Sequence, residues 1–432
     1  MKKRILFFFF LGCSAFSYGQ WTLEQCIDTA LTHNVSLLAK QFQVEKAEIY
    51  KNGSRYNILP SVGLTATHGY NWGQTIDLFT NQFATNRVQF DNFYLSSSVT
   101  LFSGLQNYYG IRVADNRSEQ AGLEKAIAER NIRIDVTTTY LQLLLNKEVL
   151  KNAERKYQDN ILWLNRFREL RSAGQAVDAE LIEAEALLEE SNYLKIKAKS
   201  DVSYSQLLLK QLLNIQTDQP IDIAEMSLDS LTITLAAPDV NEQPEMLLLS
   251  LREQEYLYLL KSAKGRFYPT LLMSGSLGSG FSGNSKYQLP DGSYDVIPFE
   301  DQIGSNFYRS ILFSLNVPIF SRMANVQQCR LRKLELESLQ VEKQSSYIRL
   351  QQQLEQLKLE ISTTMAQLEA VEKSEKAASV NYDNSVLLYE NKNITFSHLQ
   401  FQNHKLQTAV SDHLQATYRL YQKLLILSYF VQ

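Results

Sequence analysis

Apolar residues recur along much of the chain at alternating spacings of four and three, and this pattern extends over several heptads. The repeat runs through 181–212 in the first half of the chain, and through 350–371 and 406–431 in the second half. Sustained four-three spacing predicts long helices that pack as coiled coils. A continuous helix from about Leu105 to Arg171 would be on the order of 100 Å long. We therefore expect the helices to project well beyond any compact domain.

Four short segments break the helical pattern with strict alternation. Ser61 to Trp72 reads "SVGLTATHGYNW", with apolar residues at every second position and serine, glycine or threonine between them. Similar alternation occurs at 93–101, 271–277 and 310–319. None of the four segments contains Asp, Glu, Lys or Arg, although these residues make up 21% of the chain. The pattern is typical of transmembrane β-strands that face lipid on one side and a polar lumen on the other.

Aromatic residues near the predicted strand ends are expected at the membrane–water interface. They are Tyr70, Trp72, Phe93, Tyr94, Phe307 and Tyr308. The signal of each strand is weak by itself, so a half-buried sheet in an exported soluble protein stays open as an alternative.

The number of strands bears on the assembly. Four strands per chain cannot close a membrane barrel, because an open edge in lipid leaves backbone groups unpaired and the smallest barrels have about eight strands. Several chains must therefore pool their strands. Two strands in each half also return the chain to its starting side, so every long helix projects from one face of the membrane.

The second half of the chain repeats the first. Phe102 corresponds to Phe320 and Gly174 to Lys392, both 218 residues later, whereas Pro60 and Pro269 differ by 209. The second copy therefore has nine more residues, which we expect in the segment that joins its two strands. The predicted organisation is two repeats of a helix, a strand pair and a long helical hairpin, at 20–214 and 244–432. A proline-containing linker at 215–243, with a short strand of its own, joins them.

The N-terminus predicts export. Lys2, Lys3 and Arg4 precede an apolar run, and small residues stand before Gln20, so residues 1–19 read as a cleaved signal peptide. "FLGC" around Cys13 admits lipidation of that cysteine as an alternative. No later stretch offers the roughly 18 apolar residues of a membrane-spanning helix. The formal net charge of −3 and pI near 6.1 do not indicate a nucleic-acid partner.

No motif for covalent chemistry stands out. Gly278, Gly280 and Gly283 satisfy G-x-G-x-x-G, but no helix is predicted after them. The five histidines lack metal-ligand spacing, so neither a metal nor a cofactor is expected. After removal of the signal peptide, Cys26 and Cys329 are the remaining thiols, and we expect both to be free. The sequence predicts that the protein is not an enzyme.

Several motifs, taken in order and in duplicate, resemble the TolC family of outer-membrane efflux ducts. They are "WTLEQCIDTALTHN", "LPSVGLTAT" and "YPTLLMSGS" at the starts of the strand pairs, "VTLFSG" and "VPIFSR" at their ends, and "AGQAVDAELIEAEALL" between long helices. The resemblance implies an α+β membrane protein. Its homotrimer would form a twelve-stranded transmembrane β-barrel continued by a long periplasmic α-helical tunnel.

The same resemblance implies a function. The protein would be the outer-membrane exit duct of a tripartite efflux or type I secretion system, a passive gated conduit. Its partners would be a periplasmic adaptor, an inner-membrane transporter of the RND, ABC or MFS type, and outer-membrane lipid. An exported coiled-coil structural protein with a soluble β-sheet is the alternative.

The resemblance also assigns candidate sites. The hairpin turns that meet the adaptor would be Ala173, Gly174 and Gln175 in the first copy and Asn391, Lys392 and Asn393 in the second. Glycine accepts a left-handed backbone readily, whereas the second copy has lysine at that position. There, the flanking asparagines are expected to supply the left-handed residue.

The tunnel constriction would lie just past these turns, at Glu180 and Glu183 in the first copy and at His398 and Phe401 in the second. Family members often carry acidic residues after the second turn, and a carboxylate gate is not supported here. In a trimer His398 would form a ring of three imidazoles, which makes pH-dependent gating a hypothesis. The alternatives are a solvated or interhelical histidine and, for the glutamates, solvated helix surface.

Overall fold

The computed structural model describes residues 20–77, 79, 81, 83–84, 87–174, 177–226 and 238–431. The predicted signal peptide therefore lies outside the described residues. The chain divides into two compact units. One, here the helical unit, comprises residues up to Gln41, Lys125–Pro244 and the chain from Tyr347 onward; the other, the sheet unit, comprises Phe42–Glu124 and Glu245–Ser346. Among the described helices, none has an 18-residue window apolar enough to cross a membrane.

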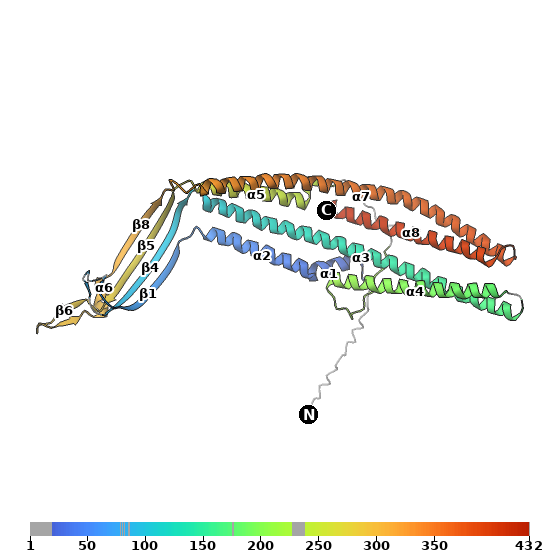
Figure 1. Ribbon diagram of the computed structural model, residues 1–432, viewed down its shortest axis with the longest axis horizontal. Helices are drawn as coiled ribbons and strands as arrows, with labels where there is room; N and C mark the ends of the chain where they lie inside the picture. The colour runs from blue at the N-terminus through green and yellow to red at the C-terminus, as the bar shows by residue number, and fades with distance from the viewer. Residues whose placement is uncertain are drawn as a thin grey trace, which may run out of the picture. The chain divides into compact units, whose positions relative to one another are not determined.

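The helices and strands occur in the same order in both halves of the chain (Figure 1). The first half contains α1 (Leu23–His33), α2 (Val35–Tyr56), β1 (Ser61–Asn71), β4 (Val88–Ser103), α3 (Gln106–Ser172) and α4 (Asp178–Leu213). The second half contains α5 (Pro244–Gly265), β5 (Thr270–Ser282), β8 (Tyr308–Asn316), α7 (Ala324–Glu390) and α8 (Phe396–Val431). The loop of the first strand pair holds β2 (Thr75–Ile76) and β3 (Phe83–Ala84). The loop of the second holds β6 (Lys286–Gln288), β7 (Tyr294–Val296) and α6 (Phe299–Ser305).

The lengths of the elements follow the internal repeat. Helices α3 and α7 both have 67 residues, α4 and α8 both have 36, and each second-half helix of these pairs begins 218 residues after its counterpart. Helices α2 and α5 both have 22 residues and begin 209 apart, as do β1 and β5. The nine extra residues thus lie between the start of β5 and the start of α7. The fold is therefore an internal duplication.

Four strands form one antiparallel sheet in the order β1-β4-β5-β8. Neighbouring strands pair in register along nearly their whole length, with one irregularity between Thr100 and Phe102. We call the end of the sheet where β1 finishes and β4 begins its loop end. Among the described strands, β1 and β8 each pair with a single neighbour, so both edges of the sheet are open.

The strands differ in length from the alternating segments of the sequence. β4 begins at Val88 and includes Asp91, β8 includes Arg309, and β8 ends at Asn316 although the alternation continues to Ile319. Backbone pairing does not require uncharged side chains, so at the loop end the strands continue beyond the uncharged alternating segments. At the other end Pro318 has no N–H to donate to a sheet, and the strand stops before it.

Helix α6 satisfies the edge of β5 beyond the last residue paired with β8 (Figure 1). The Gln302 side-chain amide accepts a hydrogen bond from the Ser282 N–H at 2.9 Å and donates to the Ser282 carbonyl at 3.0 Å. The Asn306 amide donates to the Gly280 carbonyl at 2.8 Å. Side-chain amides thus take the place of a missing neighbouring strand, which explains why Gln302 is buried.

The helical unit is held together by the predicted four-three seam. In α4 the buried positions include Leu181, Ala184, Ser191, Ala198, Val202, Ser205 and Leu209. In α7 they include Leu350, Leu354, Leu357 and Ile361, and Leu357 and Ile361 pack with Leu420 and Leu427 of α8. These are seam residues of the sequence pattern, so the coiled-coil prediction is confirmed at these positions.

A short parallel bridge joins the N-terminal segment to the linker between the repeats. Trp21 pairs with Ile223, and the Tyr140 hydroxyl of α3 lies 3.0 Å from the Trp21 carbonyl oxygen and 2.8 Å from that of Ala224. Burial raises the pKa of the Tyr140 phenol and of the Cys26 thiol beside it, the latter to about 12. The linker expected to hold a strand therefore has a bridge residue, the short η2 helix (Val240–Glu242), and residues 227–237, which lie outside the described ranges.

The turn between β4 and α3 depends on a glycine. Gly104 has a φ of +61°, and a Cβ atom there would lie 2.1 Å from the Gly265 carbonyl oxygen at the end of α5. Gly104→Ala is therefore expected to destabilise the sheet unit by about 3 kcal/mol, from left-handed strain and from a clash with backbone that cannot rotate away. Thermal or denaturant unfolding of the purified protein measures the loss.

Gly53 of α2 is the matched control for Gly104. It lies inside a helix, with nothing within 4 Å of an added Cβ. Gly53→Ala should stabilise the protein slightly, by about 0.5–1 kcal/mol, because alanine restricts the unfolded chain and suits a helix. Equal effects of the two substitutions would contradict the role assigned to Gly104.

Candidate functional site

The two faces of the four-stranded sheet differ in chemistry. Residues paired across antiparallel strands lie on the same face, so the register sorts every side chain. One face, here the polar face, is mainly small and hydroxylated: Ser61, Gly63, Thr65 and Thr67 of β1, Asn92, Tyr94, Ser96, Ser98 and Thr100 of β4, Ser274, Ser276 and Gly278 of β5, and Tyr308, Ser310, Ser314 and Asn316 of β8. Val88, Phe90, Leu272 and Leu312 also lie on it.

The opposite face, here the apolar face, exposes large hydrophobic side chains over all four strands. Leu64, Leu95, Leu277 and Ile311 all lie there, and Phe313 is 61% exposed. Monomeric soluble proteins rarely expose so continuous an apolar surface. An apolar face opposite a face of serines and threonines is the arrangement of a barrel wall between lipid and water.

Serine pairs bridge the strands on the polar face. The hydroxyls of Ser276 and Ser310 are 2.8 Å apart, and those of Ser61 and Ser98 are 3.1 Å apart. These pairs satisfy one another in part and remain exposed, so the face is suited to contact with water.

The predicted interface aromatics fall on both faces. Tyr70 lies on the apolar face near the loop end, followed by Trp72, and Arg87 stacks 5.1 Å from the Tyr70 ring. Phe93 is also on the apolar face, where it contacts Phe299 of α6. Phe307 is exposed just before β8.

Tyr94 and Tyr308 lie on the polar face instead. Tyr94 and Phe93 are also inside β4, not at its start, because the strand begins at Val88, before the alternating segment. The sequence analysis took the start of the alternation, Phe93, as the start of the strand. Strand pairing shows that five more residues, 88–92, precede it in β4.

The hairpin turns contain the left-handed residues that the turns require. Gly174 has a φ of +71° and its N–H donates to the Arg171 carbonyl. In the second turn Lys392 itself has a φ of +57°, so the expectation that a flanking asparagine supplies the left-handed residue is wrong. Asn391 and Asn393 donate instead to carbonyls at the end of α7, those of Leu387 and Leu388, and so satisfy the helix end.

The predicted turn residues within the described ranges are all exposed. Ala173 and Gly174 are exposed, as are Asn391, Lys392 and Asn393. Gln175 lies outside the described residues.

Aromatic residues just behind the turns join the two hairpins. Phe396, the first residue of α8, is 1% exposed, and its ring centroid is 4.6 Å from that of Phe167 of α3. Trp163 of α3 and Tyr389 of α7 contact the same ring. We call these four residues the aromatic cluster. Leu181 and Ala184 of α4 pack in the same core, so all four long helices meet there.

The predicted constriction residues lie beside this cluster. The Ser397 hydroxyl donates to the Glu183 carboxylate, 2.9 and 2.8 Å from its two oxygens, and thereby links α8 to α4. Glu180 is half-buried, whereas His398 is exposed and its Nε2 is 3.4 Å from Nε2 of Gln402. Phe401 is 56% exposed, with Lys405 stacked 4.5 Å from its ring. The structure thus joins Glu183 to Ser397, the residue before His398, a contact that the sequence did not predict.

Charged pairs connect the helices further along. In the helical unit Lys423 of α8 contacts Glu360 of α7 at 2.6 Å, and this hydrogen bond lowers the pKa of the Glu360 carboxyl. His413 of α8 likewise contacts Glu375 of α7. In the sheet unit Lys343 of α7 contacts Glu253 of α5 at 2.8 Å and lowers the pKa of that carboxyl.

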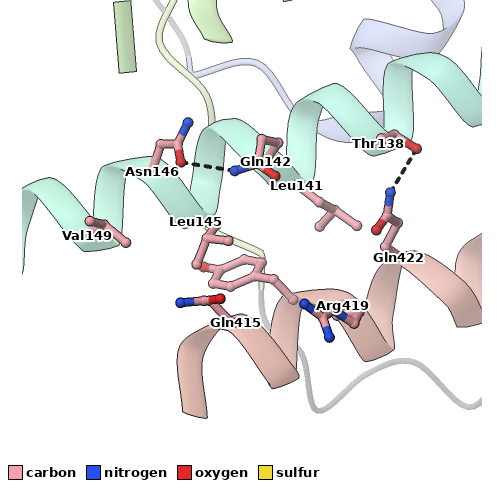
Figure 2. Close-up of a pocket in the computed structure, with 10 residues that line it drawn as sticks. Thr138, Leu141, Gln142, Leu145, Asn146, Val149, Gln415, Arg419 and Gln422 are labelled. Carbon is pink, nitrogen blue, oxygen red and sulfur yellow. Dashed lines mark hydrogen bonds between the residues drawn. The ribbon is translucent and has the colours of Figure 1, made fainter. Parts of the chain in front are cut away.

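A groove of about 320 Å³ runs between α3 and α8 in the helical unit (Figure 2). It is lined mostly by amides and alkyl groups: Thr138, Leu141, Gln142, Leu145, Asn146, Val149, Gln415, Tyr418, Arg419 and Gln422. Gln142 donates to Asn146 at 3.0 Å, and Gln422 donates to Thr138 at 3.1 Å. The lining can form hydrogen bonds, but it holds no carboxylate, histidine or cysteine for acid–base or nucleophilic chemistry.

Side chains that could bind a metal or act as thiols are scattered in the described part of the chain. In the part of the chain that the structure describes, no three His, Cys, Asp or Glu side chains are grouped as metal ligands. Cys26 is buried and Cys329 half-buried, and both are free.

A sheet with one lipid-compatible face and open edges, in a chain with two very long helical hairpins, defines a class of protein: a protomer of a membrane channel. Residues 26–214 match the family described as outer membrane efflux protein. No curated protein matches the sequence well enough to count as a relative.

Solved structures share the fold over nearly the whole chain. The open state of the Neisseria gonorrhoeae MtrE outer membrane channel is 18% identical, with a TM-score of 0.80, over 95% of this chain and 88% of that one. The Campylobacter jejuni CmeC outer membrane channel is 17% identical, with a TM-score of 0.77, over 95% and 85%. The Vibrio cholerae outer membrane protein VceC is 13% identical, with a TM-score of 0.73, over 94% and 95%.

Residues 26–214 thus resemble the outer membrane efflux protein family, and nearly the whole chain has the fold of its TolC-like channels. Its fold is that of one protomer of a trimer, in which three four-stranded sheets form a twelve-stranded barrel continued by an α-helical tunnel. Proteins of this family are channels of the outer membrane and not enzymes.

Proposed function

We propose that this protein is the outer-membrane exit duct of a tripartite transport system, and that it works as a passive conduit gated at the end of its helical tunnel. The observation that carries the proposal is the sheet: four strands with open edges, an exposed apolar face and a face of serines and threonines. A protein that hydrolyses nothing must take its energy from a pump elsewhere. A periplasmic adaptor and an inner-membrane transporter, of the RND, ABC or MFS type, supply that link.

The adaptor is proposed to dock at the two hairpin turns. The proposed contact residues are Ala173, Gly174, Gln175, Asn391, Lys392 and Asn393, and those that the structure describes are exposed. The backbone strain of a left-handed lysine is tolerated where the turn must also present a charged side chain. Lys392 therefore offers a cation to an acidic or carbonyl-rich adaptor surface.

Site-specific crosslinking in living cells tests the docking. A photo-crosslinking residue replaces Lys392, and the matched control replaces Lys333, an exposed lysine of α7 in the sheet unit. The proposal expects a crosslink from position 392 to a periplasmic protein that co-purifies with an inner-membrane transporter, and none from position 333. Equal labelling from both positions, or labelling from neither, would contradict it.

The membrane-facing surface is proposed to contact lipid through the apolar face. Tyr70, Trp72, Phe93 and Phe307 then lie at the interface near the loop end, where amphipathic rings are favoured. The two linked repeats, residues 20–214 and 244–432, each supply two strands and one hairpin to this architecture, and residues 1–19 are the proposed export signal.

The tunnel constriction is proposed to lie at the start of α4 and α8, at Glu180, Glu183, His398 and Phe401. In the trimer the three His398 side chains would form a ring of imidazoles. We expect single-channel conductance of the wild-type trimer to depend on pH between about 5 and 8, and His398→Ala to abolish that dependence. His404→Ala, which removes another exposed histidine six residues along the same helix, is the control. An unchanged pH profile in His398→Ala would end this assignment.

A further inference from the structure

Two tyrosines lie together on the polar face of the sheet, which otherwise has small side chains over most of its length. Tyr94 of β4 and Tyr308 of β8 are both paired with Gly278 of β5, which lies between them. Their ring centroids are 6.3 Å apart, with the rings 65° from parallel. Two strands that are not neighbours thus place aromatic rings side by side, because the strand between them carries no side chain at that row.

Gly278 makes room for this pair. A Cβ atom at Gly278 would lie 2.6 Å from two ring carbons of Tyr308 and 2.7 Å from its hydroxyl oxygen. The phenol end of Tyr308 therefore rests over the Gly278 backbone, and any larger residue would displace it. Tyr308 is nevertheless 43% exposed, so part of its ring remains accessible from the polar face.

Among the described strand residues of the polar face there is one further aromatic, Phe90 of β4, whose ring lies against Gly69 of β1. Among the described strand residues on that face, none is Asp, Glu, Lys or Arg. The charged strand residues Asp91 and Arg309 both lie on the opposite, apolar face. An aromatic ring attracts a cation over its face, most strongly a large organic cation that loses little hydration. The tyrosine pair places two adjacent rings on this surface, and is therefore its strongest cation-attracting element among the described strand residues.

We propose that Tyr94 and Tyr308 form an aromatic site in the barrel lumen that binds organic cations on their way out. The inference rests on the proposed function, since the polar face lines a lumen only in the assembled barrel. Each chain contributes two rings at one level, so a trimer carries six at that level. Gly278 is eight residues along β5 from Thr270, about 27 Å along the strand at the usual rise. The rings therefore lie in the part of the barrel nearer the loop end.

Voltage-dependent block of single channels tests the site, with tetrabutylammonium added on the barrel side of a planar bilayer. The block is measured as the fraction of current lost from channels that already conduct. It therefore reports on the cation in the barrel and not on the opening of the tunnel. Wild-type trimers should be blocked, and the double variant Tyr94→Ser/Tyr308→Ser should need about tenfold more cation for the same block. Tyr94→Phe/Tyr308→Phe keeps the rings and should keep the block.

Two further variants make the result decisive. Tyr294→Ser removes an exposed tyrosine of β7, outside the sheet, and should leave the block unchanged. Gly278→Ala keeps both tyrosines but forces the Tyr308 ring to move, so it should alter the block without removing an aromatic group. If the serine variant misfolds, Gly278→Ala and the phenylalanine variant still test the site.

The outcomes separate the two levels of the proposal. Conducting wild-type trimers whose block is the same in the serine double variant would overturn the aromatic site and leave the duct intact. Wild-type protein that forms no conducting trimer would overturn the duct itself.

Discussion

Phe313→Arg is expected to prevent stable assembly of the barrel. Phe313 lies on the apolar face near the middle of strand β8, paired with Met273 of β5, and is 61% exposed in the single chain. An arginine there would face lipid at mid-depth, which costs about 2–4 kcal/mol per chain. Because three chains each pay this cost, the fraction of heat-resistant trimer in the outer-membrane fraction should fall steeply.

The neighbouring residue supplies the control for this prediction. Ser314→Arg adds the same side chain one position further along, on the polar face. Charged groups that face a water-filled lumen are tolerated, so the trimer should form at near the wild-type level and show a shift toward anion selectivity. Equal loss of trimer in both variants would contradict the assignment of faces.

Phe396→Ala is expected to release the end of the helical unit. The side chain is fully buried in the aromatic cluster, and removal of a buried phenylalanine costs about 3–5 kcal/mol. The loss falls on contacts of the first turn of α8 with α3, so the barrel should still assemble. Faster proteolysis near 391–395 and a higher single-channel conductance are the measurements.

Phe401→Ala is the control for Phe396→Ala, because it removes an exposed phenylalanine of the same helix instead of a buried one. Phe401 lies five residues further along α8, is 56% exposed, and contacts Lys405. Its truncation should change stability by no more than about 0.5 kcal/mol, as for most surface positions. A Phe401→Ala variant as sensitive to protease as Phe396→Ala would argue that the aromatic cluster has no special role.

The sequence pattern predicted well what depends on periodicity. The four-three seam marks residues of α4, α7 and α8 that are buried, and alternation identified all four long strands of the sheet. Both signals arise because one face of an element must be covered, and that requirement recurs at a fixed period. The constant 218-residue offset between the two copies likewise predicted two helical hairpins of equal length, as the structure has them.

Features that depend on contacts between distant residues were not predictable in this way. Alternation assigns Tyr94 to one side of its strand, but only the register places it level with Gly278 and Tyr308. Asp91 and Arg309 lie just outside the uncharged alternating segments, so the alternation did not mark them as strand residues. Lys392 was not expected to be left-handed, because a side chain disfavours that conformation. The penalty is nevertheless small enough for the end of a helix to impose it.

The aromatic cluster had a signal that was overlooked. Phe396 stands where the first copy has Asp178, 218 residues earlier, so a buried aromatic residue replaces an exposed acid at the same helix start. Trp163 and Phe167, four residues apart on α3, form the complementary surface. A comparison of the two copies for apolar residues present in only one of them would have pointed to this contact.

The central claim is that three chains pool their strands into one barrel, and the mass of the unboiled protein extracted from outer membranes tests it most directly. Sedimentation or light scattering, corrected for bound detergent, should give three chains per particle, with detergent required for extraction. A monomer recovered without detergent would mean that the apolar face never meets lipid, and would contradict the account.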